Sequence, residues 1–246
     1  MKFFNFKKRE FNSNKKKAFT LPEMMITISV IGIVAAITFP MLIASYQKKA
    51  ALAQLQKVYQ DINQAMKIAV ADAKLEDLDY TLSPYKFFKK YMTSVLVVSE
   101  TTMSELKSRG IKYRQISGAQ ETGLAIMGSN ASKTHIINLS NGAQLFLTDI
   151  DSTTPSNRTI YLDINGFGMP NTFGKDCYML VITKKGNNVV FHNTDDGIPV
   201  KSDVPRNTLI NGPSQHNYQC NGSGRGMWCG ALIQQDGWEF KSDYPW

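Results

Sequence analysis

One stretch of the sequence, Met24–Ala44 (MMITISVIGIVAAITFPMLIA), contains 21 residues and no charged side chain. A helix of this length would span about 31 Å, which is close to the roughly 30 Å thickness of a bilayer's hydrocarbon core. The run is long enough to cross a membrane, and it lies near the start of a chain of 246 residues. We therefore predict a single transmembrane segment over about residues 24–45.

The distribution of charge predicts how this segment is oriented. The formal net charge of the chain is +8, and residues 1–18 hold seven basic side chains and one acidic one, so 7 − 1 = +6 of it lies before the run. The positive-inside rule then keeps the N-terminal residues in the cytoplasm and sends the chain after Tyr46 out of it. A basic chain can also suggest nucleic-acid binding, but here the basic excess flanks a membrane segment, so nucleic acid is an unlikely partner.

Composition excludes several other classes of protein. With 43% hydrophobic residues, 20% charged residues and three cysteines, the chain is neither collagen-like nor mostly disordered, and it is not a disulfide-stapled miniprotein. Its length suffices for one sizeable core outside the membrane.

The residues before the apolar run carry a specific motif. The segment Lys15–Met24 (KKKAFTLPEM) closely resembles the processing motif of the type IV pilin-like and type II secretion pseudopilin family. The resemblance implies that prepilin peptidase cleaves between Ala18 and Phe19 and that Phe19 becomes N-methylated. It departs from the family at Ala18, where glycine is usual, and at Pro22, where an aliphatic residue is usual. Proline is tolerated there because the first-turn N–H groups have no helical partner.

Glu23 is a physical oddity that supports this interpretation. A carboxylate at the edge of an apolar helix is costly and is usually paired with a cation. Cleavage after Ala18 would create such a cation, the new amine of Phe19, one helical turn away. In the family this pairing, within or between chains, is thought to set the register of subunits in the filament, so the resemblance implies that role for Glu23.

Two other interpretations of the N-terminus were weighed. A cleaved secretory signal fits poorly because Leu42 lies three residues before any cut after Ala44. An uncleaved signal anchor is not excluded by hydrophobicity. It would make the chain a monomeric extracytoplasmic protein that binds a ligand or calcium.

Gly32 and Pro40 lie inside the apolar run. Proline cannot donate to the carbonyl of Ala36, so we expect the helix to kink or loosen there. In the pilin family that this motif resembles, a glycine and a helix-breaking proline lie at these distances from the cleavage site. The resemblance therefore implies a helix break at Gly32 and Pro40.

Beyond Tyr46 the chain stays helical but becomes amphipathic. Apolar residues recur at alternating spacings of three and four, and the helix should run over residues 19–75 with a length of about 80 Å. A coiled-coil dimer would use the same stripe, but the charge pattern beside it is weak, which favours packing on the chain's own head. The stripe consists of Leu52, Leu55, Tyr59, Ile62, Met66, Ala69 and Ala73.

The rest of the chain, residues 76–246, is expected to form an extracytoplasmic globular head after the cytoplasmic leader of residues 1–18. Segment 83–110 indicates short helices and loops, with a stop at Gly110. From His135 the apolar pattern alternates, and Asn141-Gly142 signals a hairpin. Strands are predicted within 136–139, 143–147, 159–164, 177–182 and 189–191. The fold class is thus α+β: a long N-terminal helix packed on an antiparallel sheet.

A loop between two of these strands has oxygen-bearing side chains that suit calcium. Asp163, Asn165 and Asp176 lie in a D-x-N-G…P-N…G-K-D pattern resembling loops of some pilin-like proteins, and related major pseudopilins bind calcium in a loop of the head. The same residues are ordinary in turns, and no EF-hand pattern is present. We lean toward a structural turn, with calcium as the alternative and no cofactor required.

The cysteines allow three single pairings. Cys220 and Cys229 enclose eight residues rich in glycine, and a disulfide is favoured outside the cytoplasm. Similar cysteine loops near the end of the chain occur in many pilins. We favour this pair and expect Cys177, in an apolar strand, to be a buried thiol.

No catalytic apparatus is visible in the sequence. Its three histidines, His135, His192 and His216, are far apart and have no metal-ligand spacing, and no nucleophile elbow or phosphate loop is present. The chain is therefore expected to be a non-enzymatic filament subunit in the inner membrane, with prepilin peptidase and other subunits as partners. The sequence does not distinguish a pilus from a secretion pseudopilus or a DNA-uptake fibre.

Overall fold

The structure is a computed structural model, and it describes residues 19–73, 78–93, 97–122, 131–150, 159–184, 187–194, 201 and 203–246. The expected leader, with Ala18 at its end, lies outside the described residues. The chain divides into two compact units, Met1–Gln47 and Lys48–Trp246, which are described separately below. The head therefore includes the second half of the long helix.

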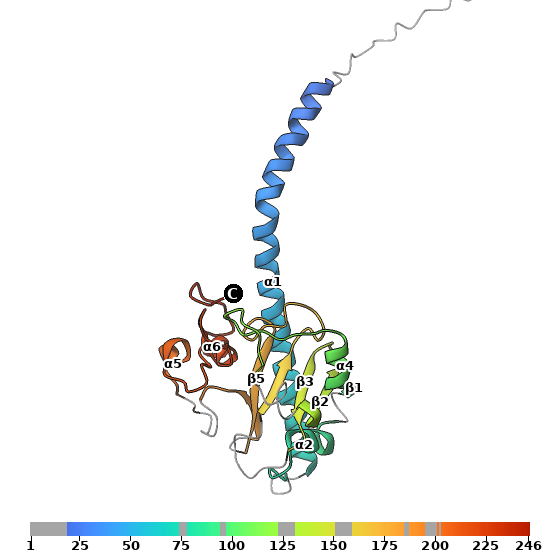
Figure 1. Cartoon of the computed structure of the whole chain (residues 1–246), viewed down its shortest axis with the longest axis vertical. Coiled ribbons are helices and arrows are strands. Elements are labelled where there is room, and N and C mark those ends of the chain that lie inside the picture. The colour runs from blue at the N-terminus through green and yellow to red at the C-terminus, as the bar shows by residue number, and fades with distance from the viewer. Residues whose placement is uncertain are drawn as a thin grey trace, which may run out of the picture. The chain divides into compact units, whose positions relative to one another are not determined.

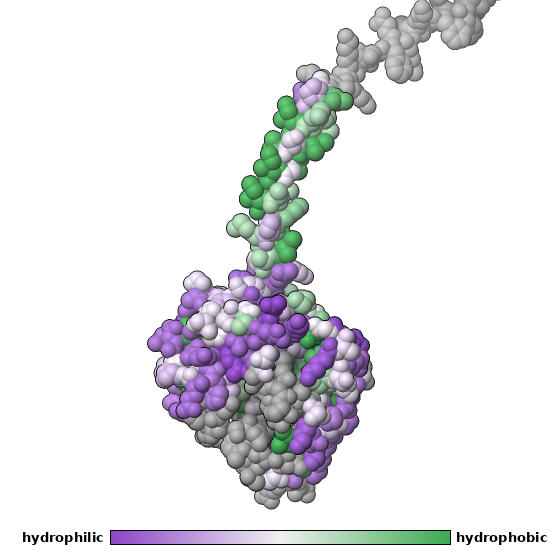
Figure 2. All heavy atoms as spheres, in the orientation of Figure 1, coloured by the Kyte–Doolittle hydropathy of each residue, from purple (hydrophilic) through white to green (hydrophobic). Residues whose placement is uncertain are grey.

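The long helix α1 comprises Leu21–Ala73, 53 residues (Figure 1). In its first half the large apolar side chains are exposed, from 46% at Met24 to 80% at Phe19 just before the helix. Figure 2 shows these apolar side chains in green along that half. Among the described residues, α1 is the one helix long and apolar enough to cross a membrane.

Helix α1 continues through Gly32 and Pro40, so it is not interrupted at either residue, and the kink or loosening expected at Pro40 stays a prediction. Pro40 removes one N–H donor from the helical ladder. The turns on either side keep their own hydrogen bonds, and helices in membranes accommodate a proline in this way.

The head half of α1 buries the predicted apolar stripe. Leu55, Ile62 and Met66 are fully buried and Ala69 is nearly so, while Leu52 and Tyr59 are partly buried against the same core. This half of the helix packs on its own head, as expected from the pattern.

The head contains a six-stranded sheet in which every neighbouring pair is antiparallel and consecutive in sequence. Figure 1 shows α1 crossing behind it. Its strands are β1 (Val97–Thr102), β2 (Thr134–Leu139), β3 (Gln144–Thr148), β4 (Thr159–Asp163), β5 (Cys177–Thr183) and β6 (Asn188–Phe191). The α+β fold class is thereby confirmed.

The β2–β3 hairpin forms where the sequence predicts it, with Ile137 opposite Leu145. Gly142 has a φ of 87°, a conformation that glycine adopts without steric cost. The Asn141 side chain accepts a hydrogen bond from the Ala143 N–H at 3.1 Å. Local turn chemistry thus fixes the register of this hairpin.

Strand β1 is a correction to the sequence analysis, which assigned 83–110 to short helices and loops. The segment contains α2 (Pro84–Tyr91), then β1, then α4 (Met103–Ser108). The strand is at the edge of the sheet and its last four residues, Ser-Glu-Thr-Thr, are polar, so the alternating apolar signal of a half-buried strand is absent.

Short helices complete the head. In α2, Phe87 and Phe88 are buried while Lys89 and Lys90 are exposed, so the helix packs its phenylalanines on the core and presents its lysines to solvent. Among the described residues, further short helices are η1 (Ala131–Lys133), α5 (Arg206–Asn211) and α6 (Cys229–Gln235).

Helix α1 also covers the outer edge of the sheet at β6. The Asn63 side chain donates to the Val189 carbonyl at 2.9 Å and accepts from the Val189 N–H at 3.0 Å. One amide side chain therefore supplies both hydrogen bonds that a further strand would give this residue, and an edge open to aggregation is closed at this point.

We predict that Asn63→Ala lowers the free energy of unfolding of the head by about 2 kcal/mol, because it leaves the buried N–H and C=O of Val189 without partners. Chemical denaturation of the purified protein in detergent measures this. Gln64→Ala, at an exposed position on the same helix, is the matched control and should change stability by less than about 0.5 kcal/mol. Equal effects of the two substitutions would contradict the role of Asn63.

Candidate functional site

The start of α1 is closed by a capping box formed by Thr20 and Glu23. The Thr20 N–H and hydroxyl both donate to Glu23 Oε2 at 2.8 Å, and the Glu23 N–H donates to the Thr20 hydroxyl at 3.4 Å. These bonds satisfy N–H groups that have no partner within the helix. Both bonds to the carboxylate use Oε2, so the capping box leaves Oε1 available to an approaching cation.

Thr20 was missed in the sequence analysis although its signal is present. Thr-x-x-Glu before an apolar run is a capping-box pattern. Because Glu23 was interpreted through its charge alone, its local role went unnoticed. The structure places Glu23 in the first turn of α1 and Phe19 just before it, while the cleavage residue Ala18 is not described.

A second candidate site is the β4–β5 loop, residues 164–176, where buried carboxylates come together. Oxygen atoms of Asp163 and Asp176 and the sulfur of Cys177 lie within 4.8 Å of one another. Asp163 ends β4 and Cys177 begins β5, so strand pairing brings the two ends of the loop together. Asn165 Nδ2 lies 3.3 Å from Asp176 Oδ2, so the structure groups all three residues of the predicted cluster.

Each carboxylate oxygen of this pair accepts a hydrogen bond. Asp176 accepts from the backbone N–H groups of Asn171 at 2.7 Å and Thr172 at 2.6 Å. Asp163 accepts from the Tyr113 hydroxyl at 2.9 Å and from the Asn165 N–H at 3.1 Å. The carboxylates thereby hold the path of the loop. Tyr113 was not predicted, and no sequence pattern links it to a residue fifty positions away.

Burial disfavours charge on these groups. Burial, and after it the charge of Asp176, raises the pKa of Asp163 well above its ordinary value. Burial also raises the pKa of Asp176, although the hydrogen bonds from the N–H groups of Thr172 and Asn171 lower it in part. The same cause raises the pKa of Cys177, which is therefore a protonated, buried thiol rather than a reactive one.

The fit of calcium to this loop depends on which oxygens are available. Calcium takes six to eight oxygen ligands. Asn165 Oδ1 and Asn171 Oδ1 are buried and have no hydrogen-bond partner among the described residues, so a cation would find them there. The carboxylate oxygens, however, are already approached by N–H and O–H donors. We therefore expect hydrogen bonds, rather than calcium, to hold the loop.

A disulfide-closed segment packs against the same loop. Cys220 and Cys229 are joined, the pairing that the sequence favoured. A Cβ atom at Gly174, whose φ is 85°, would lie 2.8 Å from Cys229 Sγ and 2.6 Å from Ile116 Cδ1, so only glycine fits this approach. The Tyr244 hydroxyl donates to the Gly174 carbonyl.

Arg225, inside the disulfide-closed segment, extends this network. Its guanidinium forms two hydrogen bonds to the buried Glu121 carboxylate, at 2.8 Å and 2.6 Å. Glu121 is in a segment that also contains Ile116. The ion pair therefore ties the disulfide-closed segment to the segment that contains Glu121, while Tyr244 ties residues near the end of the chain to the β4–β5 loop.

Each of the three histidines packs against an aromatic ring in the described part of the head. His135 Nδ1 lies 2.8 Å from Glu100 Oε1, beside the ring of Tyr85. The structure does bring His192 and His216 to one ring, that of Tyr218, although they are distant in sequence. These contacts pack aromatic rings within the head.

Comparison with known proteins agrees with this architecture. Residues 13–39 match the prokaryotic N-terminal methylation motif, the hallmark of type IV pilins and pseudopilins, so the chain carries the N-terminal motif of type IV pilin-like proteins. It belongs to a family of unknown function (DUF6613), which matches residues 41–246. No curated protein and no solved structure matched the chain.

The match also bears on location and class. A methylation motif before a long apolar helix fits membrane anchoring. Proteins with this motif are structural rather than enzymatic.

We predict that the contribution of Asp163 to head stability falls as pH rises from about 4, because Asp163 binds its proton more tightly in the folded protein than in the unfolded chain, where its pKa is near 3.8. The effect ends once pH exceeds the folded pKa. Melting temperature measured against pH should be flatter for Asp163→Asn than for wild type. Asp203→Asn, at an exposed position, should leave the profile unchanged.

The same melting experiment tests calcium. A bound cation would raise stability by about 2.7 kcal/mol at a hundredfold excess over Kd. Wild type should melt identically with millimolar calcium and with chelator. A calcium-dependent rise in Tm that Asp163→Asn abolishes would show that the loop is a calcium site.

Proposed function

We propose that this protein is a structural subunit of a type IV pilus-like or type II secretion pseudopilus filament, matured by prepilin peptidase. The observation that carries the proposal is the methylation motif at residues 13–39, which includes the start of a membrane-length helix that continues into an α+β head. In the proposed life cycle the chain is stored in the inner membrane with the head outside the cytoplasm. After cleavage, the exposed apolar half of α1 is transferred from lipid to the filament core.

The geometry at Glu23 supports a role in assembly. Its carboxylate caps its own helix through Oε2, while Oε1 is available for the amine of a neighbouring Phe19. A single carboxylate can therefore cap the start of its own helix and also form an ion pair with a second chain. Burial in an apolar filament core would strengthen that ion pair, because unpaired charge is costly there.

We predict cleavage between Ala18 and Phe19. Co-expression with an active prepilin peptidase should yield a protein 18 residues shorter whose first residue is N-methylated Phe19, measured by mass spectrometry of the intact chain and its N-terminal peptide. A catalytically inactive peptidase provides the control. An intact Met1 in the presence of the active enzyme would contradict the proposal and would favour a signal-anchored monomer.

Two substitutions separate the charge of Glu23 from its capping role. Glu23→Ala should insert normally into the membrane, since a costly charge is removed, but should fail to enter sheared filaments. Thr20→Ala removes the partner in the capping box, at a cost of about 1 kcal/mol to the helix end, and keeps the carboxylate. It should assemble.

Filament incorporation of both variants is measured by shearing and pelleting, alongside their membrane levels. If Glu23→Ala assembles as wild type, the register role is wrong. If Thr20→Ala fails as severely as Glu23→Ala, the cap and not the charge is what assembly requires.

A further inference from the structure

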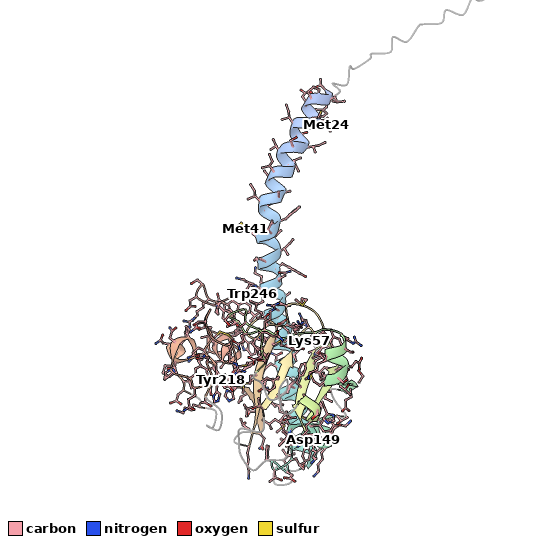
Figure 3. The ribbon with its side chains drawn as sticks, in the orientation of Figure 1. Met24, Met41, Lys57, Asp149, Tyr218 and Trp246 are labelled. Atoms are coloured by element: carbon pink, nitrogen blue, oxygen red, sulfur yellow. A yellow bond between two sulfur atoms is a disulfide. The ribbon has the colours of Figure 1, made fainter. Side chains whose placement is uncertain are left out.

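An aromatic cluster lies beside the first head turn of α1. Trp246 packs on Phe240 with ring centroids 4.9 Å apart, and Phe240 packs on Tyr244 at 4.6 Å. Lys48 Nζ lies 5.8 Å from the centroid of the Trp246 ring, within the range of a cation–π contact. Figure 3 labels Trp246 next to α1. Both Lys48 and the Trp246 ring are half-buried, so part of each faces solvent.

The position of this cluster along the chain is fixed by covalent distance. The uncharged run ends at Ala44, four residues before Lys48. Four residues span about 6 Å of helix and at most about 14 Å of extended chain. The interfacial region on each side of a bilayer is roughly 5–7 Å thick. Whatever the orientation of the head, Lys48 and the ring it contacts therefore remain close to the headgroups while the run spans the membrane.

The residues at this place have the chemistry of an interfacial anchor. Tryptophan and tyrosine are enriched at membrane interfaces, where an apolar ring with one polar edge suits a boundary between lipid and water. Lysines extend their ammonium groups to phosphates there. Lys48 and Lys49 follow Tyr46, which is 73% exposed. The helix thus supplies Tyr46 and two lysines within four residues, and Trp246 adds a second aromatic ring through its contact with Lys48.

We propose that Trp246, together with Lys48 of α1, binds the interfacial layer of phospholipids, so that the head is held to the bilayer through the Trp246 ring as well as through its helix. This inference rests on the membrane-anchored stage of the proposed function. The partner is the lipid surface itself, through its glycerol and phosphate layer. The anchor would hold the stored subunit in a limited range of orientations and would have to release when the subunit leaves the membrane.

The remaining tryptophans allow a matched test. Trp228 is buried, with its indole N–H donating to the Thr194 carbonyl at 3.1 Å. The ring centroids of Trp238 and Tyr59 are 5.4 Å apart. Tyr59 is eleven residues after Lys48 in α1, which corresponds to about 17 Å of helix. Trp246 should be the tryptophan nearest the lipid, and Trp238→Phe is the control for Trp246→Phe.

The experiment uses the full chain reconstituted into phosphatidylcholine–phosphatidylglycerol vesicles that carry bromine near the top or near the end of the acyl chains. Brominated lipid should quench part of the wild-type tryptophan emission, more strongly from the shallow position. Trp246→Phe should lose that quenchable part, and Trp238→Phe should keep it. Melting curves confirm that each variant is folded, and Trp246→Tyr serves in place of Trp246→Phe if the latter is not.

Three outcomes would overturn the proposal. Quenching that persists in Trp246→Phe, or that is lost in Trp238→Phe, would show that another face meets the lipid. An absence of lipid quenching in wild type would show that Trp246 stays in water. A protein that is cleaved and assembles normally yet shows no quenching would refute the anchor while leaving the filament role intact.

Discussion

The structure depends on one helix that must suit two environments. A chain crossing a bilayer has to satisfy its backbone hydrogen bonds internally, and α1 does so while exposing apolar side chains on every face of its first half. Its second half buries only one stripe, with Leu55, Ile62 and Met66 in the core of the head. The same helix also packs against one face of the sheet. Through Asn63 it supplies hydrogen bonds to Val189 in the edge strand β6.

Much of this fold could be predicted from the sequence because its signals are local. The apolar stripe of α1 and the alternating strands around Asn141-Gly142 depend on neighbours a few residues apart. Strand β1 escaped prediction because it is a partly polar edge strand, and α1 continues past Pro40 because one missing donor leaves the flanking turns intact. The capping box at Thr20 was local too, and it was overlooked because Glu23 already had an explanation.

The candidate site in the head was only half predictable. Asp163 and Asp176 could be grouped because they flank one loop, whereas Tyr113 joins them through tertiary packing alone. The same holds for Gly174, whose need for glycine arises from Cys229, far along the chain. Composition indicates which residues can bind a cation. It does not show that N–H and O–H groups already approach the same oxygens, and this difference decides between a metal site and a clamped turn.

The consecutive order of the six strands bears on how such a head can form when it emerges N-terminus first. From β2 onward, each strand finds its partner already present in the preceding segment, so no strand has to wait for a distant one. The closing contacts are different in kind. Tyr244 reaches back to Gly174, and Cys220 can join Cys229 only once the last part of the chain has arrived. Secretion and oxidation would thus lock a sheet that is already assembled, and a chain truncated before residue 229 would lose its lock while keeping every strand.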